Sequence, residues 1–130
     1  MSGGVDSNAL VAVSRRELNH EVHGFTIVNT DKRYEEKALV EASVRELGID
    51  HTCITLQTDG FLDGLRALVR QHDAPVYTIT YYAHWRLQQA MSDAGYRISI
   101  SGTAADELFS GYFDHHNAYL YDISDDPDLF

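Results

Sequence analysis

The stretch Ser2-Gly3-Gly4-Val5-Asp6-Ser7, followed by the apolar run 9–13, guides the interpretation of the whole chain. Adjacent glycines let backbone N–H groups turn toward an anion, and Asp6 or Ser7 can cap the helix that the apolar run predicts. The start of a helix also carries a partial positive charge. Because no lysine follows the glycines, the pattern is not a Walker A loop. The stretch predicts a phosphate-binding loop, with a plain Gly-Gly turn into a capped helix as the alternative.

A second motif stands about a hundred residues later. It reads Ser101-Gly102-Thr103-Ala104-Ala105-Asp106-Glu107-Leu108-Phe109-Ser110-Gly111-Tyr112 and follows a β-prone run at 96–100. This motif closely resembles the Ser-Gly-x-x-x-Asp-Glu-Leu/Val-Phe-x-Gly-Tyr signature of the asparagine synthetase family. The first stretch resembles the PP-loop of ATP pyrophosphatases, which split ATP between its α and β phosphates. The two motifs together place the resemblance over nearly the whole chain.

Hydrophobic periodicity between the motifs alternates strand and helix. The pattern predicts helices over 8–18, 34–47, 61–71 and 80–94, and strands over 21–29, 51–56 and 96–100. Such alternation implies βαβ crossovers and a parallel sheet, whose ligands bind at the carboxyl ends of the strands. Together with the resemblance, it predicts an α/β fold: a Rossmann-like, three-layer parallel sheet with helices on both faces.

The position of the first motif bears on domain organisation. A PP-loop normally follows a buried strand in the middle of the sheet, and Met1 stands where the last residue of that strand belongs. We therefore expect the central first strand to be missing and the chain to be a fragment of a longer synthetase. Residues 1–121 are expected to form a partial ATP-binding domain, and residues 122–130 an acidic tail.

Charge and composition exclude several classes of function. Ten Lys+Arg against twenty Asp+Glu give a formal net charge of −10. Such a surface repels nucleic acid and anionic membranes, so neither is an expected partner. The single cysteine, Cys53, permits no intrachain disulfide, which fits a reducing cytoplasm. No apolar stretch approaches the roughly 20 residues of a membrane-spanning helix.

The resemblance assigns candidate site residues to both motifs. It implies that the loop binds the pyrophosphate part of ATP, that two carboxylates bind Mg²⁺, and that the second motif and the end of the second strand contact the nucleotide. The pyrophosphate ligands are Ser2, Gly3, Gly4 and Ser7; the metal ligands are Asp6 and Asp106; the nucleotide contacts are Ser101, Gly102, Ile27 and Met1. Asp106 and Thr103 hold the catalytic positions.

Simpler interpretations exist for the same acids, and one position departs from the family pattern. Asp6 can be only a helix cap, and Asp106-Glu107 can be first-turn acids stabilised by the helix dipole. Asparagine-forming relatives usually carry a catalytic glutamate where this chain has Thr103. Because threonine cannot act as a carboxylate base, ATP binding and adenylation are better supported than aspartate as the substrate.

The resemblance implies an ATP-dependent amide-forming ligase. A carboxylate is adenylated and then attacked by ammonia, which comes from a glutaminase domain not present here. The carboxylate is aspartate or another acid, such as a sugar acid. Another PP-loop ligase and a non-catalytic nucleotide-binding domain are the rival interpretations, and a homodimer is left open. The fragment alone is expected to have negligible synthetase activity.

Overall fold

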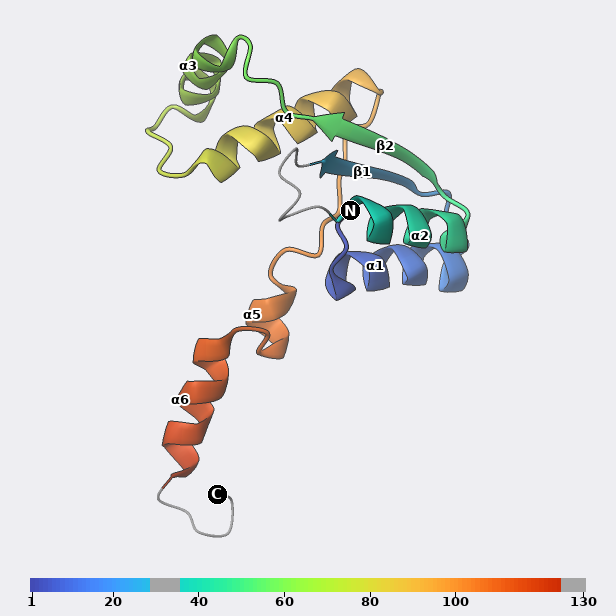
Figure 1. The fold of residues 1–130 in the computed structure, drawn as a ribbon, viewed down its shortest axis with the longest axis vertical. Helices are drawn as coiled ribbons and strands as arrows, with labels where there is room; N and C mark the ends of the chain where they lie inside the picture. Colours follow the sequence, from blue (N-terminus) through green and yellow to red (C-terminus); the bar gives the residue numbers. More distant parts are fainter. Residues whose placement is uncertain (29–35, 125–130) are drawn as a thin grey trace.

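The centre of the fold is a pair of parallel strands in a computed structural model that describes residues 1–28 and 36–124 (Figure 1). Strand β1 (His23–Val28) pairs with β2 (Asp50–Thr55), and His23 lies opposite Asp50. The sheet of the described residues has these two strands and no others. The structure confirms the mixed α/β class and the parallel pairing, while the complete three-layer sheet stays a prediction.

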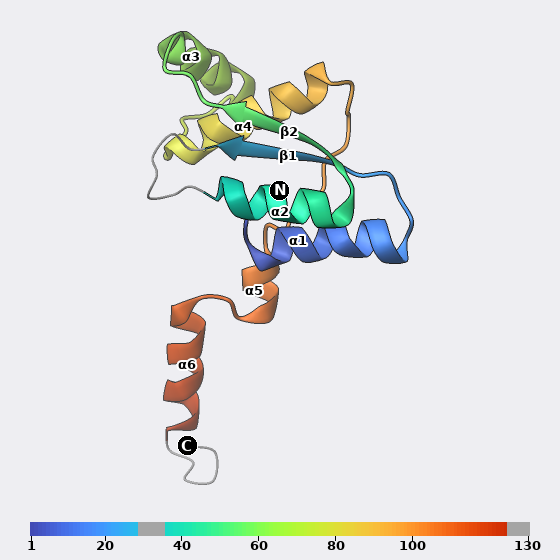
Figure 2. The same cartoon turned by 45° about the vertical axis from the view of Figure 1, so that its right-hand side comes forward.

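Helices lie on both faces of this strand pair. Figures 1 and 2 show α1 and α2 side by side on one face and α4 across the other, with α3 beyond it. The helices are α1 (Val5–Ala12), which continues into the π-helical segment η1 (Val13–Glu17), α2 (Lys37–Leu47), α3 (Phe61–His72), α4 (Ile79–Asp93), α5 (Ala105–Phe109) and α6 (Phe113–Ile123). No helix of the described ranges 1–28 and 36–124 is long and apolar enough to cross a membrane.

Apart from the strand predicted over residues 96–100, the elements predicted from the sequence agree with these bounds to within a few residues. Gly48 ends α2 in the left-handed conformation, at φ 59°, as expected for a helix stop. Residues 34–35 of the predicted second helix and residue 29 of the predicted first strand lie outside the described residues. So do residues 125–130 of the predicted acidic tail.

The strand predicted over residues 96–100 is wrong. This segment has no strand assignment, and the side chains of Ile98 and Ile100 are 84% and 77% exposed. A β-prone segment becomes a strand only when a neighbour offers a ladder of backbone hydrogen bonds. Because β1 and β2 pair with each other elsewhere, residues 96–100 have the local preference without a partner strand.

The packed core is small and lies around the strands and the α3–α4 pair. Its side chains are less than a tenth exposed: Phe25, Thr26, Val40, Leu68 and Tyr82. Val40 of α2 is 1% exposed, the lowest value among them. The helix pair α5–α6 projects away from this core in both ribbon views (Figures 1 and 2).

Candidate functional site

The Gly-Gly loop is held by hydrogen bonds between its own residues. The backbone N–H of Ser2 donates to Ser7 Oγ at 3.0 Å, and the two serine hydroxyls lie 2.9 Å apart. The backbone N–H of Gly4 donates to Ser2 Oγ at 3.2 Å. Asn8 Nδ2 closes the loop by donating to the carbonyls of Ser2 and Gly4. The loop is therefore ordered around its two serines.

Helix α1 begins directly after this loop. Its N-cap is Gly4, which makes no side-chain capping bond, and Asp6 lies within the first turn. The expectation that Asp6 or Ser7 caps the helix is wrong, because both lie beyond the cap and Ser7 Oγ turns back to the loop instead. The first-turn N–H groups thus have no capping side chain, as a phosphate-binding helix start requires.

Gly3 connects the loop to the start of α2. Its backbone N–H donates to the Glu36 carboxylate at 2.8 Å, across 33 residues of sequence. A Cβ on Gly3 would approach Leu39 Cδ1 to 3.1 Å, so the residue packs closely against the start of α2. The Gly3 N–H is therefore free to donate to an anionic oxygen from outside its own segment, as backbone N–H groups of phosphate-binding loops do.

Met1 connects the loop to the sheet. Its amino group donates to the carbonyl of Phe25 at 2.5 Å, and its carbonyl accepts from Thr26 Oγ1 at 2.7 Å. Burial lowers the pKa of this amino group below its usual value. The loop therefore leaves the edge of β1 at a fixed point.

The two motifs meet at Gly102. A Cβ built on this glycine would approach Ser7 N to 2.9 Å and the backbone and Cβ of Asp6 to 3.0 Å. Real Cβ atoms hardly ever come so close to a backbone nitrogen, so only glycine lets the second motif rest on the first turn of α1. Ser101 Oγ then donates to Thr103 Oγ1 at 2.9 Å beside this contact.

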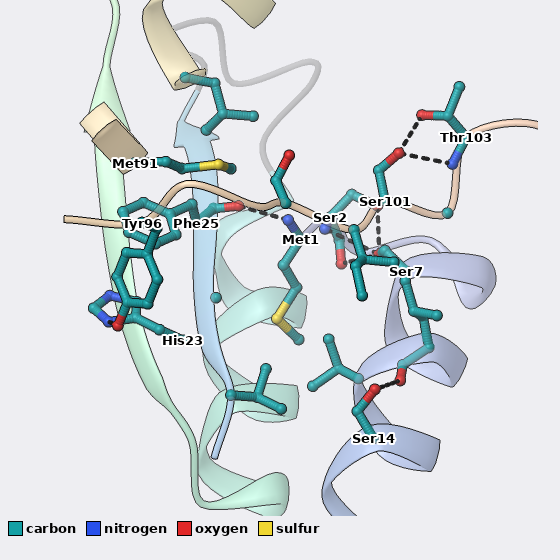
Figure 3. Close-up of a pocket in the computed structure, with 18 of the residues that line it drawn as sticks. Met1, Ser2, Ser7, Ser14, His23, Phe25, Met91, Tyr96, Ser101 and Thr103 are labelled. Carbon is teal, nitrogen blue, oxygen red and sulfur yellow. Dashed lines mark hydrogen bonds between the residues drawn. The ribbon is translucent and has the colours of Figure 1, made fainter. Parts of the chain in front are cut away.

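A cavity of about 610 Å³ contains residues of both motifs. Figure 3 shows Ser7, Ser101 and Thr103 on one side of Met1, and Phe25 and Tyr96 on the other. The predicted site residues that line this cavity are Met1, Ser2, Gly4, Asp6, Ser7, Ser101, Gly102 and Thr103. The structure therefore brings most of the predicted site together from opposite ends of the sequence.

Ile27 belongs to a second, smaller cavity of about 230 Å³, which shares Met1 and Ser2 with the first. Glu36 and Lys37, at the start of α2, also line it. The predicted base-contacting wall thus adjoins the loop, at the carboxyl end of β1.

Asp106 lies apart from both cavities. Its carboxylate is packed against Gly111, where a Cβ would overlap Asp106 Oδ1. The neighbouring acid, Glu107, accepts a hydrogen bond from the Tyr112 hydroxyl at 2.9 Å, and this bond raises the pKa of Tyr112. The described residues contain no group of three or more His, Cys, Asp or Glu side chains placed to bind a metal ion.

Sequence reasoning missed the contribution of the α2 start and of β2. The sequence places Glu36 near the start of the predicted helix 34–47, where acidic residues are common. That pattern does not indicate which loop the Glu36 carboxylate contacts. His51 on β2 lies 2.9 Å from Thr26 Oγ1, and its pKa is lowered by burial first and then by the positive charges of Met1 and His23. Such contacts depend on strand register, which the local sequence does not determine.

A family model and several curated proteins match this sequence. The asparagine synthase family model matches residues 1–126, so the chain belongs to the asparagine synthase family. A protein of Mycobacterium tuberculosis with the provisional name of glutamine-hydrolysing asparagine synthetase is 29% identical over 112 residues, covering 86% of this chain and 17% of that protein. No solved structure matches the chain.

Two further relatives show the breadth of the match. Glutamine-hydrolysing asparagine synthetase 3 of Bacillus subtilis is 28% identical over 134 residues, covering 91% of this chain and 21% of the relative. The amidase chyE of Penicillium rubens is 24% identical over 142 residues, which cover 98% of this chain and 20% of the relative. The chain thus spans about a fifth of the length of the curated relatives it matches.

Proposed function

We propose that this chain is the ATP-binding part of an ATP-dependent amide-forming ligase of asparagine synthetase type. In the proposed reaction a carboxylate oxygen attacks the α-phosphorus of ATP and pyrophosphate leaves. Ammonia then attacks the acyl carbon, AMP leaves, and an amide forms. In the proposed complete ligase, ammonia comes from hydrolysis of glutamine by another domain, in keeping with the names of the relatives.

The contact of Gly102 with the first turn of α1 is the observation that carries this proposal. It supports a single nucleotide site built from two motifs that lie about a hundred residues apart. The alternative is that residues 2–7 form a plain Gly-Gly turn and that Asp106-Glu107 only begin a helix. In that case residues 2–7 and 101–103 would not need to be in contact. The Gly3–Glu36 hydrogen bond supports the fit of a phosphate, because a loop N–H group already binds an anionic oxygen.

The donor set is also compatible with Mg²⁺. This ion usually takes one or two protein carboxylates and completes its shell with water and phosphate oxygens, so a ready-made group of three side chains is not needed. Asp6 and Asp106 are the carboxylates that would hold this ion, although the structure packs the Asp106 carboxylate on Gly111, outside the cavity that Asp6 lines. When bound, the metal offsets the charge that builds on the departing pyrophosphate.

The acceptor carboxylate is the finer part of the proposal. Thr103 offers a hydroxyl, already bonded to Ser101, where a carboxylate base would stand in asparagine-forming relatives. A hydroxyl can position an acyl group but cannot take a proton from ammonia at neutral pH. We therefore propose that the acceptor is aspartate or another acid, such as a sugar acid.

Titration of the chain with ATP in the presence of Mg²⁺ tests the nucleotide site. We expect binding that Gly102→Ala weakens by at least about tenfold, or about 1.4 kcal/mol, because the added methyl separates the two motifs. Ser92→Ala on α4 is the control and should leave the affinity unchanged. Equal affinities of the Gly102→Ala and control proteins, with unchanged circular dichroism, would refute a shared site.

Exchange of labelled pyrophosphate into ATP by the complete ligase, with a panel of carboxylates, then identifies the acceptor. Exchange with aspartate supports the asparagine synthetase activity. Exchange with a different acid alone supports an amidotransferase for that acid. Nucleotide binding without any exchange contradicts the ligase and supports a nucleotide-binding domain without turnover.

A further inference from the structure

A buried threonine on β1 joins the glycine loop to the neighbouring strand β2. Thr26 is 7% exposed, and its hydroxyl donates to the carbonyl of Met1 at 2.7 Å. The same Oγ1 atom lies 2.9 Å from Nε2 of His51. A buried hydroxyl is tolerated where its donor and acceptor groups have partners, and these two contacts provide them. Thr26 therefore lies between the Met1–Ser2 peptide and a histidine of β2.

Gly24 gives the His51 ring room to reach this threonine. Gly24 lies opposite His51 in the parallel register of the two strands, and Thr26 lies opposite Cys53. A Cβ on Gly24 would come within 3.0 Å of His51 Cδ2. A side chain at position 24 would therefore crowd the ring, and a glycine within a strand is typical of such a close approach.

The donors and acceptors along these contacts can be assigned in only one way. The single hydroxyl proton of Thr26 goes to the Met1 carbonyl, which can only accept. Thr26 Oγ1 must therefore accept from His51, so Nε2 of the ring carries a proton. In the neutral ring Nδ1 is then an acceptor, and it faces the weak donor Cys53 Sγ at 3.7 Å. Burial lowers the pKa of His51, which favours the neutral form.

The carbonyl that Thr26 binds belongs to a peptide group that orders the loop. The C=O of Met1 and the N–H of Ser2 lie in one plane and point in opposite directions, because the peptide group is planar and trans. This N–H donates to Ser7 Oγ at 3.0 Å, and the Ser7 and Ser2 hydroxyls lie 2.9 Å apart. A rotation of the peptide would change both hydrogen bonds together. The orientation of this peptide thus connects Thr26 to the serines of the loop.

We propose that His51 and Thr26 are positioning residues for the glycine loop: the His51 Nε2–H directs the Thr26 hydroxyl to the Met1 carbonyl, which fixes the Met1–Ser2 peptide for phosphate binding. This inference rests on the proposed nucleotide site. Without the Thr26 hydroxyl, the Met1 carbonyl loses its side-chain donor, and the Ser2 N–H can turn away from Ser7. Both side chains therefore act on the nucleotide through this peptide.

Nitrogen NMR of the 130-residue chain tests the assigned direction of these hydrogen bonds without any nucleotide. The two ring nitrogens of His51 give separate signals, and each signal shows whether its nitrogen carries a proton. Where the ring is neutral, we expect the proton on Nε2, and Thr26→Val should shift the ring to a mixture of the two tautomers. A proton on Nδ1 alone in the unaltered chain would overturn the proposal.

Removal of the Thr26 hydroxyl tests its effect on the loop. Thr26→Val keeps the shape of the side chain, and Thr26→Ser keeps the hydroxyl. Thr52→Val is the matched control, because it removes a hydroxyl oxygen that lies 2.8 Å from Nε2 of another histidine, His23. We expect Thr26→Val to speed amide hydrogen exchange at Ser2 by at least about fivefold, and the other two variants to stay within about twofold of the original chain.

Two outcomes of this exchange experiment would overturn the proposal. One is an equal rate at Ser2 in Thr26→Val and Thr52→Val. The other is a rate in Thr26→Ser as fast as that in Thr26→Val, because the serine keeps the hydroxyl. Exchange at Val40, which is 1% exposed, shows in the same experiment that each variant keeps the folded core.

Titration with ATP and Mg²⁺ separates this inference from the proposed function. Thr26→Val should weaken binding by at least about fivefold, and Thr26→Ser should restore it to within about twofold of the original chain. Unchanged affinity in Thr26→Val would overturn the positioning role, while the nucleotide site would stand. If the original chain binds no ATP, the proposed function fails, and the exchange rates at Ser2 alone decide whether Thr26 and His51 position the loop.

Discussion

At the scale of single residues, Glu36 is the contact that most directly opposes the proposed nucleotide. Its carboxylate accepts from the Gly3 N–H, so a phosphate oxygen must displace it. Displacement breaks a charge-assisted bond and brings two negative groups together, and both effects weaken nucleotide binding. In the proposed nucleotide site, Glu36 would therefore compete with a phosphate for the Gly3 N–H.

Replacing Glu36 with glutamine should therefore strengthen nucleotide binding. We expect Glu36→Gln to lower the Kd for Mg-ATP by about three- to tenfold, or roughly 1 kcal/mol, measured by calorimetric titration. Glu46→Gln is the matched control, because Glu46 is on the same helix and pairs with Arg16 at 2.9 Å. Weaker binding by Glu36→Gln than by the control would show that Glu36 assists the nucleotide and would contradict the competition.

The local sequence indicates which residues form the Gly-Gly loop, but it does not indicate which distant side chains contact that loop. Ser2, Gly4 and Ser7 were identified because a Gly-Gly loop before a helix has a local backbone meaning. Glu36 was not identified, because its contact with Gly3 depends on where α2 lies relative to α1. Asp106 was assigned to the metal from the motif alone, and the structure packs its carboxylate on Gly111 instead of in a cavity with Asp6.

At the scale of elements, the helix pair α3–α4 depends on one aromatic side chain. Tyr82 is 5% exposed, packs edge-on against Phe61 with ring centroids 4.8 Å apart, and lies against Gly64 and Trp85. A Cβ on Gly64 would come within 2.9 Å of the Tyr82 ring. This close approach fixes how the two helices pack.

Removing the Tyr82 ring should therefore destabilise the helix pair. We expect Tyr82→Ala to lower the free energy of unfolding by about 3 kcal/mol, measured by urea denaturation, because a buried aromatic side chain leaves a cavity. Tyr77→Ala is the control: Tyr77 is 83% exposed, and its loss should cost less than about 0.5 kcal/mol. Similar losses for both variants would contradict the packing role of Tyr82.

Element prediction succeeded where the local pattern is enough and failed where a partner is needed. Apolar spacing and stop signals predicted α2, α3 and α4, because a helix makes its hydrogen bonds within its own segment. The run at 96–100 has the same local β preference as β1, but strand formation requires a neighbouring chain. Residues 96–100 therefore form no strand in the described part of the chain.

At the scale of the whole molecule, the chain exposes more surface than its size predicts. Its accessible surface is 10178 Å², whereas a compact protein of its mass exposes about 6,900 Å². Part of the excess comes from the projecting α5–α6 pair, where Phe109 and Phe113 are 82% and 78% exposed. We therefore expect low stability for the chain, since few side chains are fully buried.

The half-buried amino group of Met1 should make stability depend on pH. Because burial lowers the pKa of this group below 8.0, the folded state disfavours its charged form. The contribution of this amino group to the free energy of unfolding is most favourable above pH 8.0. That contribution is lost as the pH falls through the lowered pKa. Acetylation of Met1 replaces the ammonium by a neutral N–H and removes this loss.

Urea denaturation of the acetylated and free chains, compared at several pH values, measures this effect without the background of the other charges. The acetylated chain should be the more stable of the two at low pH, and the difference should shrink as the pH rises toward 8.0 and stay small above it. A difference that does not change with pH, or one that grows at high pH, would contradict the burial of a charged group at Met1.

Residues 2–7 and 101–103 are proposed to bind the same nucleotide. Amide hydrogen exchange of the chain, with and without a non-hydrolysable ATP analogue and Mg²⁺, tests it most directly. We expect the analogue to slow exchange in both segments at the same ligand concentration, while exchange in α6 is unchanged. Protection of one segment without the other, or of neither at saturating analogue, would contradict a site shared by the two motifs.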